Sequence, residues 1–247
     1  MSYRLLSVEE VADYLHLGRA DVERLVKRRE IPWETRGGRV VFRRGEIDDW
    51  ASQRILGLHD QRLAEYHQQS TRGIRKLLPL EAILPGLIQP EFIDPAMTAK
   101  TKASVLRELV ALAAKTGRLF DPRDLLASLE AREALCSTGL PGGWALSHPR
   151  HPQPYLIETS FLVLGRPIQE IPFGATDGQP TDLFFLICCP DERMHLHTLA
   201  RLCLMAQKTE LLAQLRQAPD AASMHQCLLA AETAVLERTR ASAKSPA

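Results

Sequence analysis

The sequence lacks several features that would point to a class of protein. No apolar run is long enough to span a bilayer, and the N-terminal Met-Ser-Tyr-Arg lacks the apolar segment of a signal peptide. The formal net charge is only +1, so the overall charge indicates no class of partner. We therefore expect a cytoplasmic protein without membrane insertion.

The sequence also lacks the cysteine spacing of disulfide frameworks and zinc sites. It has five cysteines, an odd number, and no two of them have C-x-x-C spacing. This pattern disfavours a disulfide framework and a zinc knuckle, and we expect mostly reduced cysteines on apolar faces. The cysteines are Cys136, Cys188, Cys189, Cys203 and Cys227.

Two pairs of histidines are the other candidate ligands for a metal ion. His148 and His151 are close in sequence, as are His195 and His197. Positions two apart on a helix face different directions, and no cysteine or acidic ligand is suitably spaced. We expect no metal and no cofactor.

The length of 247 residues and the hydrophobic content of 45% allow one sizeable core and a second small one. We expect a small domain over 1–52, a helical linker over 53–76, a large domain over 77–236 and a flexible tail over 237–247. The linker is helical in composition, but its apolar spacing is too short for a coiled coil.

Two short helices are predicted in the small domain. Ser7 and Glu10 form a capping box at the start of the first helix. A second helix begins at Arg19 or Ala20, extends to Arg29 and carries apolar residues on one face. The pair is typical of a helix-turn-helix.

A hairpin follows over 33–42, with a Gly-Gly turn flanked by arginines, and is predicted to be a wing. Three segments carry a family resemblance: Leu-Leu-Ser-Val-Glu-Glu-Val-Ala-Asp-Tyr-Leu, Val-Glu-Arg-Leu-Val-Lys-Arg-Arg-Glu-Ile-Pro, and the stretch from Gly37 to Trp50. Residues 4–50 resemble the excisionase-like branch of the winged helix-turn-helix domains related to MerR regulators.

The resemblance implies DNA binding, with the second helix in the major groove and the wing on the phosphate backbone. It assigns Arg24, Lys27 and Arg28 to the recognition helix, and Arg39, Arg43 and Arg44 to the wing and its exit. A dimerisation or docking module is the alternative, because residues 1–50 hold as many acidic as basic residues. Helix-turn-helix proteins commonly act as dimers, so a homodimer fits this resemblance.

The large domain is predicted to contain two helices, then a run of strands, and then two or three further helices. Helices are predicted over 101–116, from the N-cap Asp121 to Leu135, and from near Glu192, Glu210 and Ala221. Strands are predicted over Gly143–Leu146, Tyr155–Leu164 and Asp182–Cys189, with a turn at Asp177-Gly178. Helices around a central sheet predict an α/β fold.

His148 is the candidate nucleophile of this domain, because it stands at the end of a short strand, directly before Pro149. A neutral imidazole is nucleophilic near pH 7, and a phosphoryl group is a suitable electrophile. Arg132 and the N-terminus of the helix near His195 would supply positive charge. The alternative is a solvated loop histidine.

The stretches 130–139 and 143–148 resemble the active-site region of the nitrogen-regulatory and fructose-mannitol type IIA domains of the bacterial phosphotransferase system. Pro167-Ile168 with 177–185 resembles that family's hairpin, and 195–200 its second histidine motif. The resemblance implies a mixed β-sheet flanked by helices. It also implies that His148 accepts a phosphoryl group from the phosphocarrier HPr or its nitrogen-branch counterpart, with His195 and Arg132 stabilising the phosphoryl oxygens.

These two resemblances together predict a DNA-binding regulator that responds to phosphorylation of His148. One alternative is a phosphocarrier that passes the phosphoryl group to a sugar-transporting subunit. The other is a regulator that acts by protein binding alone and catalyses nothing.

Overall fold

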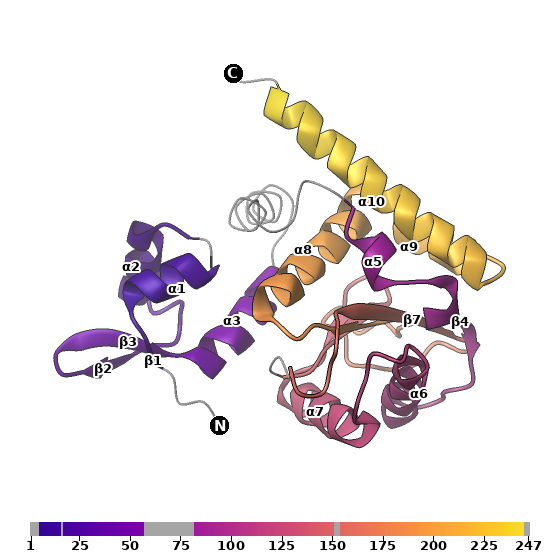
Figure 1. Ribbon diagram of the computed structural model, residues 1–247, viewed down its shortest axis with the longest axis horizontal. Helices are drawn as coiled ribbons and strands as arrows, with labels where there is room; N and C mark the ends of the chain where they lie inside the picture. The colour runs from indigo at the N-terminus through magenta and orange to yellow at the C-terminus, as the bar shows by residue number, and fades with distance from the viewer. Residues whose placement is uncertain (1–4, 16, 57–81, 151–153, 245–247) are drawn as a thin grey trace. The chain divides into compact units, whose positions relative to one another are not determined.

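The computed structural model describes residues 5–15, 17–56, 82–150 and 154–244. The chain divides into two compact units, Met1–Leu80 and Glu81–Ala247, each with its own buried core. Figure 1 shows the elements of both units. Within the described ranges, no helix has the length and apolar character needed to cross a membrane.

The first unit contains two short helices, a three-stranded antiparallel sheet and a longer helix. The elements are β1 (Leu5–Leu6), α1 (Val8–Leu15), α2 (Arg19–Lys27), β2 (Glu34–Arg36), β3 (Arg39–Arg43) and α3 (Arg44–Leu56), and the sheet order is β1-β3-β2. The predicted capping box is confirmed, since Ser7 N donates to Glu10 Oε2 at 2.8 Å and Glu10 N to Ser7 Oγ at 3.2 Å.

The predicted hairpin is confirmed as well. Arg36 pairs with Arg39 across a turn in which Gly37 and Gly38 have φ of 56° and 73°. Positive φ at both central positions gives the twist that a two-residue hairpin needs. One boundary differs from the prediction, since α2 ends at Lys27 rather than Arg29. Arg44, predicted at the wing and its exit, is the first residue of α3.

The predicted linker is described only in part. Helix α3 continues through Leu56, in agreement with a helix at the start of the connector. The remainder of the predicted linker, 57–76, lies outside the described residues.

A mixed five-stranded sheet forms the centre of the second unit. Its strands, in the order β4-β7-β8-β6-β5, are Ile93–Met97, Phe161–Pro167, Leu183–Cys188, Trp144–Ser147 and Gly139–Leu140. The pairs β4/β7 and β6/β8 are parallel, and the pairs β7/β8 and β5/β6 are antiparallel. Every residue of β8 is buried, as expected for a strand covered on both faces.

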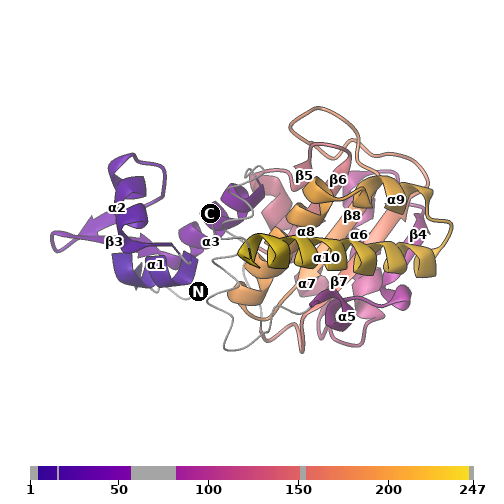
Figure 2. The same cartoon turned by 90° about the horizontal axis from the view of Figure 1, so that it is seen from above.

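Helices cover both faces of this sheet. Figures 1 and 2 show α6 and α7 on one side and α8, α9 and α10 on the other. The bounds are α5 Leu84–Leu87, a 3-10 turn at Pro90–Phe92, α6 Lys102–Ala114, α7 Pro122–Leu135, α8 Glu192–Lys208, α9 Leu211–Gln217 and α10 Ala221–Lys244. The α/β prediction is confirmed, and α10 continues past residue 236, where we expected the domain to end.

One predicted strand begins later than expected, at Phe161 instead of Tyr155. Tyr155 is in a turn, and its side chain is 67% exposed, so it has no sheet face to cover. Strand β4 was not predicted, because Asp94 and Pro95 are typical of turns. An edge strand tolerates them, since one side of its backbone makes no ladder hydrogen bonds.

A buried carboxylate joins α10 both to α8 and to the beginning of the second unit. Arg201 on α8 and Glu232 on α10 are fully buried, with Arg201 Nη1 2.5 Å from Glu232 Oε1. The same carboxylate accepts hydrogen bonds from Ile83 N at 2.9 Å and Leu84 N at 3.1 Å. These bonds satisfy a carboxylate that would otherwise be costly to bury.

Candidate functional site

The sheet topology brings His148 and His195 together. His148 directly follows β6, and α8 follows β8 after a short turn. Because β6 and β8 are parallel neighbours, their carboxyl ends lie at the same edge of the sheet. The imidazole rings of the two histidines are 4.9 Å apart between centroids.

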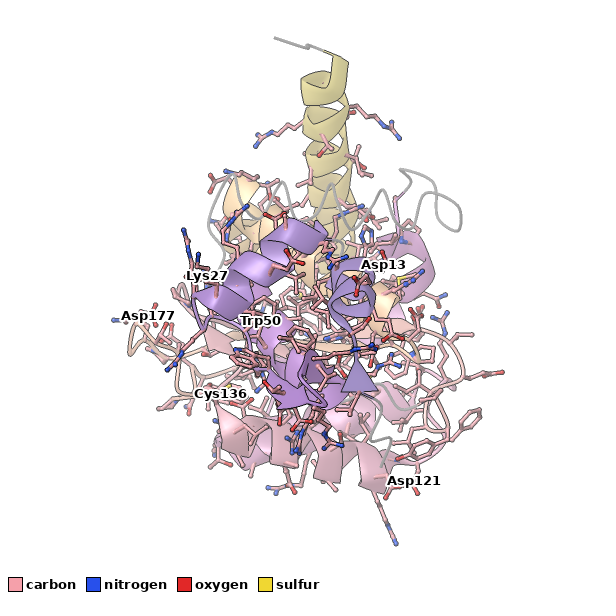
Figure 3. The ribbon with its side chains drawn as sticks, turned by 90° about the vertical axis from the view of Figure 1, so that its left-hand side faces the viewer. Asp13, Lys27, Trp50, Asp121, Cys136 and Asp177 are labelled. Carbon is pink, nitrogen blue, oxygen red and sulfur yellow. The ribbon has the colours of Figure 1, made fainter. Side chains whose placement is uncertain are left out.

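Arg132 reaches this pair from the last turn of α7. Figure 3 labels Asp121 and Cys136, which flank the two ends of this helix. Arg132 Nε donates to His148 Nε2 at 3.3 Å, and Arg132 Nη1 lies 3.0 Å from Cys136 O and 3.3 Å from Cys136 Sγ. The structure thus brings together the three residues predicted for the site.

The hydrogen bonds of His148 define its tautomer. His148 Nδ1 lies 2.9 Å from the carbonyl oxygen of Leu146, which can only accept a hydrogen bond. Nδ1 therefore carries the proton and donates to Leu146 O. Nε2 keeps its lone pair and accepts from Arg132 Nε, so Nε2 is the nucleophilic atom of the ring.

Burial keeps both imidazoles uncharged. Desolvation lowers the pKa of His148 well below its usual 6.5, and the nearby His195 and Arg132 lower it further. Desolvation also lowers the pKa of His195 to about 4, against the opposing influence of Glu192. At neutral pH the charge beside His148 is therefore that of Arg132.

The helix N-terminus expected to assist the site is already capped. Asp191 is the N-cap of α8, and its carboxylate accepts a hydrogen bond from Met194 N at 2.9 Å. The prediction that this terminus supplies positive character is corrected to that extent, because an N-cap carboxylate satisfies one of its donors and offsets the helix dipole.

A second group of residues, to which we assigned no role, holds the turn that precedes β5. The buried Glu133 carboxylate accepts from Thr138 N at 3.1 Å and Thr138 Oγ1 at 2.7 Å, and it pairs with Lys102 Nζ at 2.7 Å. Ser137 Oγ donates to Phe173 O at 2.8 Å. One feature of the sequence could have indicated this role: Glu133 is an acidic residue near the C-terminus of a predicted helix. The helix dipole disfavours an acidic residue there unless a partner compensates its charge.

The other two histidines that the structure describes make their contacts elsewhere. His197 Nε2 lies 3.5 Å from Arg201 Nη2, and His225 Nε2 lies 3.2 Å from Ile88 O. His151 is outside the described residues. In the parts of the chain that the structure describes, no three His, Cys, Asp or Glu residues are grouped to hold a metal ion.

The basic residues predicted to bind DNA differ in their pairing. Arg24 lies 3.1 Å from Asp21, Arg28 lies 4.0 Å from Glu30 and Arg43 lies 3.0 Å from Glu34, and all three arginines are exposed. Arg44 is only half exposed, with its guanidinium 5.7 Å from the centre of the Tyr14 ring.

Lys27 and Arg39 complete the set of predicted DNA contacts. Both are exposed, and neither has an ion pair with another described residue. Intramolecular pairing also accounts for the acidic residues on α2, since Asp21 pairs with Arg24 and Glu23 with Arg19 at 2.8 Å. Among the predicted contacts, the positive charge that remains for an anionic partner therefore falls most clearly on Lys27 and Arg39.

Known proteins resemble the two units separately. Residues 5–55 match a helix-turn-helix domain family. A nitrogen regulatory protein of Bradyrhizobium diazoefficiens is 35% identical over 148 residues, which cover 59% of this chain and 94% of that protein. A nitrogen regulatory protein of Pseudomonas aeruginosa is 31% identical over 131 residues, covering 52% and 83% of the two chains.

A solved structure supports the fold. The nitrogen regulatory protein IIA-Ntr from Neisseria meningitidis superposes with a TM-score of 0.54 at 24% identity, covering 60% of this chain and 99% of that one. Residues 86–231, more than half of the chain, match the family described as phosphoenolpyruvate-dependent sugar phosphotransferase system, EIIA 2. The chain therefore belongs to the phosphotransferase-system EIIA 2 family and carries in addition a helix-turn-helix domain.

Proposed function

We propose that this protein is a cytoplasmic bacterial regulator in which His148 accepts a phosphoryl group and the helix-turn-helix domain binds DNA. The observation that carries the proposal is the lone pair of His148 Nε2, held neutral and facing Arg132, in a chain with a helix-turn-helix domain. The phosphoryl donor is a phosphocarrier of the HPr type. The two nitrogen regulatory relatives support this role through their names.

The transfer uses groups already present in the site. Arg132 Nε gives up its hydrogen bond to His148 Nε2, and the freed lone pair of Nε2 attacks the phosphorus of the donor's phosphohistidine. A new N–P bond forms, and the donor's N–P bond breaks with its electron pair returning to the donor nitrogen. Arg132 neutralises charge on the phosphoryl oxygens. The proton on Nδ1 stays on His148, and Nδ1 continues to donate its hydrogen bond to Leu146 O.

Mass spectrometry of the intact chain tests phosphorylation. After incubation with phosphorylated HPr, the wild type should gain the mass of one phosphoryl group, in an adduct that is labile in acid, because His148 is the proposed nucleophile and a phosphohistidine is hydrolysed by acid. His148→Ala should gain nothing, and His225→Ala, a matched histidine on α10, should gain the same mass as the wild type. A wild type without an adduct would leave a regulator that acts by binding alone.

A further inference from the structure

One arginine in the first unit has a backbone conformation that favours glycine. Arg29 has φ of 57°, and every other described residue with positive φ is a glycine. The conformation closes the end of α2: Arg29 N donates to Val26 O at 3.0 Å and Glu30 N to Leu25 O at 2.9 Å. This helix ending normally uses glycine, because a Cβ is strained in the left-handed region.

No contact within the domain accounts for the arginine side chain. Arg29 is exposed, and its guanidinium forms no hydrogen bond or ion pair with another described residue. Its neighbour Arg28 has an ordinary φ of −85° and lies 4.0 Å from Glu30. Strained backbone positions cluster at functional sites, so we expect the guanidinium of Arg29 to act on something outside the domain.

The position of Arg29 indicates what this partner is. The residue lies in the turn between α2 and the β2–β3 hairpin, two residues after Lys27, which Figure 3 labels. Lys27 and Arg39 are, like Arg29, exposed and without an ion pair to a described residue. A planar guanidinium is well suited to phosphate oxygens, which it can bind with two parallel hydrogen bonds.

We propose that Arg29 is a further DNA contact, which binds backbone phosphate and is kept in a strained conformation for that purpose. This inference rests on the proposed DNA binding. A phosphate contact is independent of base sequence, so it contributes equally to every duplex.

The test uses Arg29→Gly in the full chain and a duplex of random sequence. Glycine relieves the strain, so the melting temperature of the N-terminal unit should rise by a few degrees. Loss of one phosphate contact should weaken DNA binding and reduce the slope of log K against log salt concentration by about one unit. Stability and affinity thus move in opposite directions.

Three variants control the interpretation. Arg29→Lys keeps the charge and the strain, so most of the slope should remain. Arg28 does not have a left-handed backbone conformation, so Arg28→Gly relieves no strain and should not raise the melting temperature. Lys27→Ala should lower the slope of log K against log salt concentration by about one unit. A raised melting temperature with an unchanged slope in Arg29→Gly overturns the inference. A lowered melting temperature in Arg29→Gly also overturns the inference, because the guanidinium would then stabilise the helix end.

The wild-type chain separates this inference from the proposed function. If the wild type shows no salt-dependent binding to the duplex, DNA binding itself fails and the role of Arg29 fails with it. If the wild type binds and Lys27→Ala lowers the slope while Arg29→Gly does not, only the role of Arg29 is refuted.

Discussion

Arg132 joins His148 to the end of α7 through one guanidinium. Its Nε contacts His148 Nε2, and its Nη1 contacts both the carbonyl oxygen and the sulfur of Cys136. A lysine ammonium would keep the charge but is a point donor on a flexible stem, without the rigid fork that reaches both neighbours.

We therefore expect Arg132→Lys to accept phosphate about 10²-fold more slowly than the wild type, the usual cost of one lost oxyanion donor. The rate is measured from the mass of the chain at intervals after mixing with phosphorylated HPr. Arg123→Lys, at the exposed start of the same helix, is the matched control and should keep the wild-type rate. An unchanged rate in Arg132→Lys would exclude its guanidinium from the transfer.

The two histidines of the site give the protein a pH dependence with a defined sign. Burial lowers the pKa of His148 well below 6.5 and that of His195 to about 4. In the unfolded chain both imidazoles take up protons near pH 6.5. Between about pH 6.5 and 4 the unfolded state binds more protons, so the free energy of unfolding decreases as pH falls.

Each imidazole contributes at most about 1.4 kcal/mol per pH unit in this window. Urea denaturation of the wild type at pH 7.5 and 5 should show this loss of stability. His195→Asn removes one of the two groups and should show a smaller loss. An equal loss in the wild type and the variant would mean that His195 is not held neutral.

Among the elements, α10 depends on one buried carboxylate. Removing Glu232 leaves the Arg201 charge buried and the Ile83 and Leu84 amides without their acceptor. We expect Glu232→Ala to lower the free energy of unfolding of the second unit by about 3–5 kcal/mol. Chemical denaturation measures this free energy. Glu237→Ala, at an exposed position on the same helix, is the control and should change the free energy of unfolding by less than about 0.5 kcal/mol. An equally small effect of Glu232→Ala would contradict the stabilising role of the buried carboxylate.

Elements with strong local signals were the predictable part of the fold. Asp121 and Pro122 define the start of α7, and α6 has a continuous apolar stripe, so both helices were predicted closely. Strand β4 was missed because Asp94 and Pro95 obscure its pattern. Its pairing with β7 depends on residues far along the chain, which no local pattern contains.

The candidate site was predictable to the same extent. His148, His195 and Arg132 were chosen from motifs, and the structure brings them together. The tautomer of His148 was not predictable, because it depends on the position of Leu146 O. The strain at Arg29 was hidden for a similar reason, since an arginine near a helix end is unremarkable in sequence and only its φ reveals it.

At the scale of the whole chain, one phosphoryl group changes the sign of the net charge. The formal charge is +1 at pH 7, and phosphohistidine adds close to two negative charges. We expect the phosphorylated chain to bind a duplex of random sequence more weakly than the unphosphorylated chain, and the difference to shrink at higher salt.

Fluorescence anisotropy of a labelled duplex measures this difference. His148→Ala, treated with the same phosphorylated HPr, is the control and should bind as it does without treatment. Equal affinities of the phosphorylated and unphosphorylated wild type would show that DNA binding does not depend on phosphorylation. That result would contradict a regulator in which phosphorylation of His148 controls DNA binding.

The buried bonds of Glu232 also set an order of events during synthesis of the chain. Ile83 and Leu84 are made first, and the carboxylate that binds their amides follows 149 and 148 residues later. At typical translation rates this interval is roughly 7 to 30 s. The first segment of the second unit must therefore wait for α10 to leave the ribosome, while the helix-turn-helix unit, complete in sequence long before, can fold in the meantime.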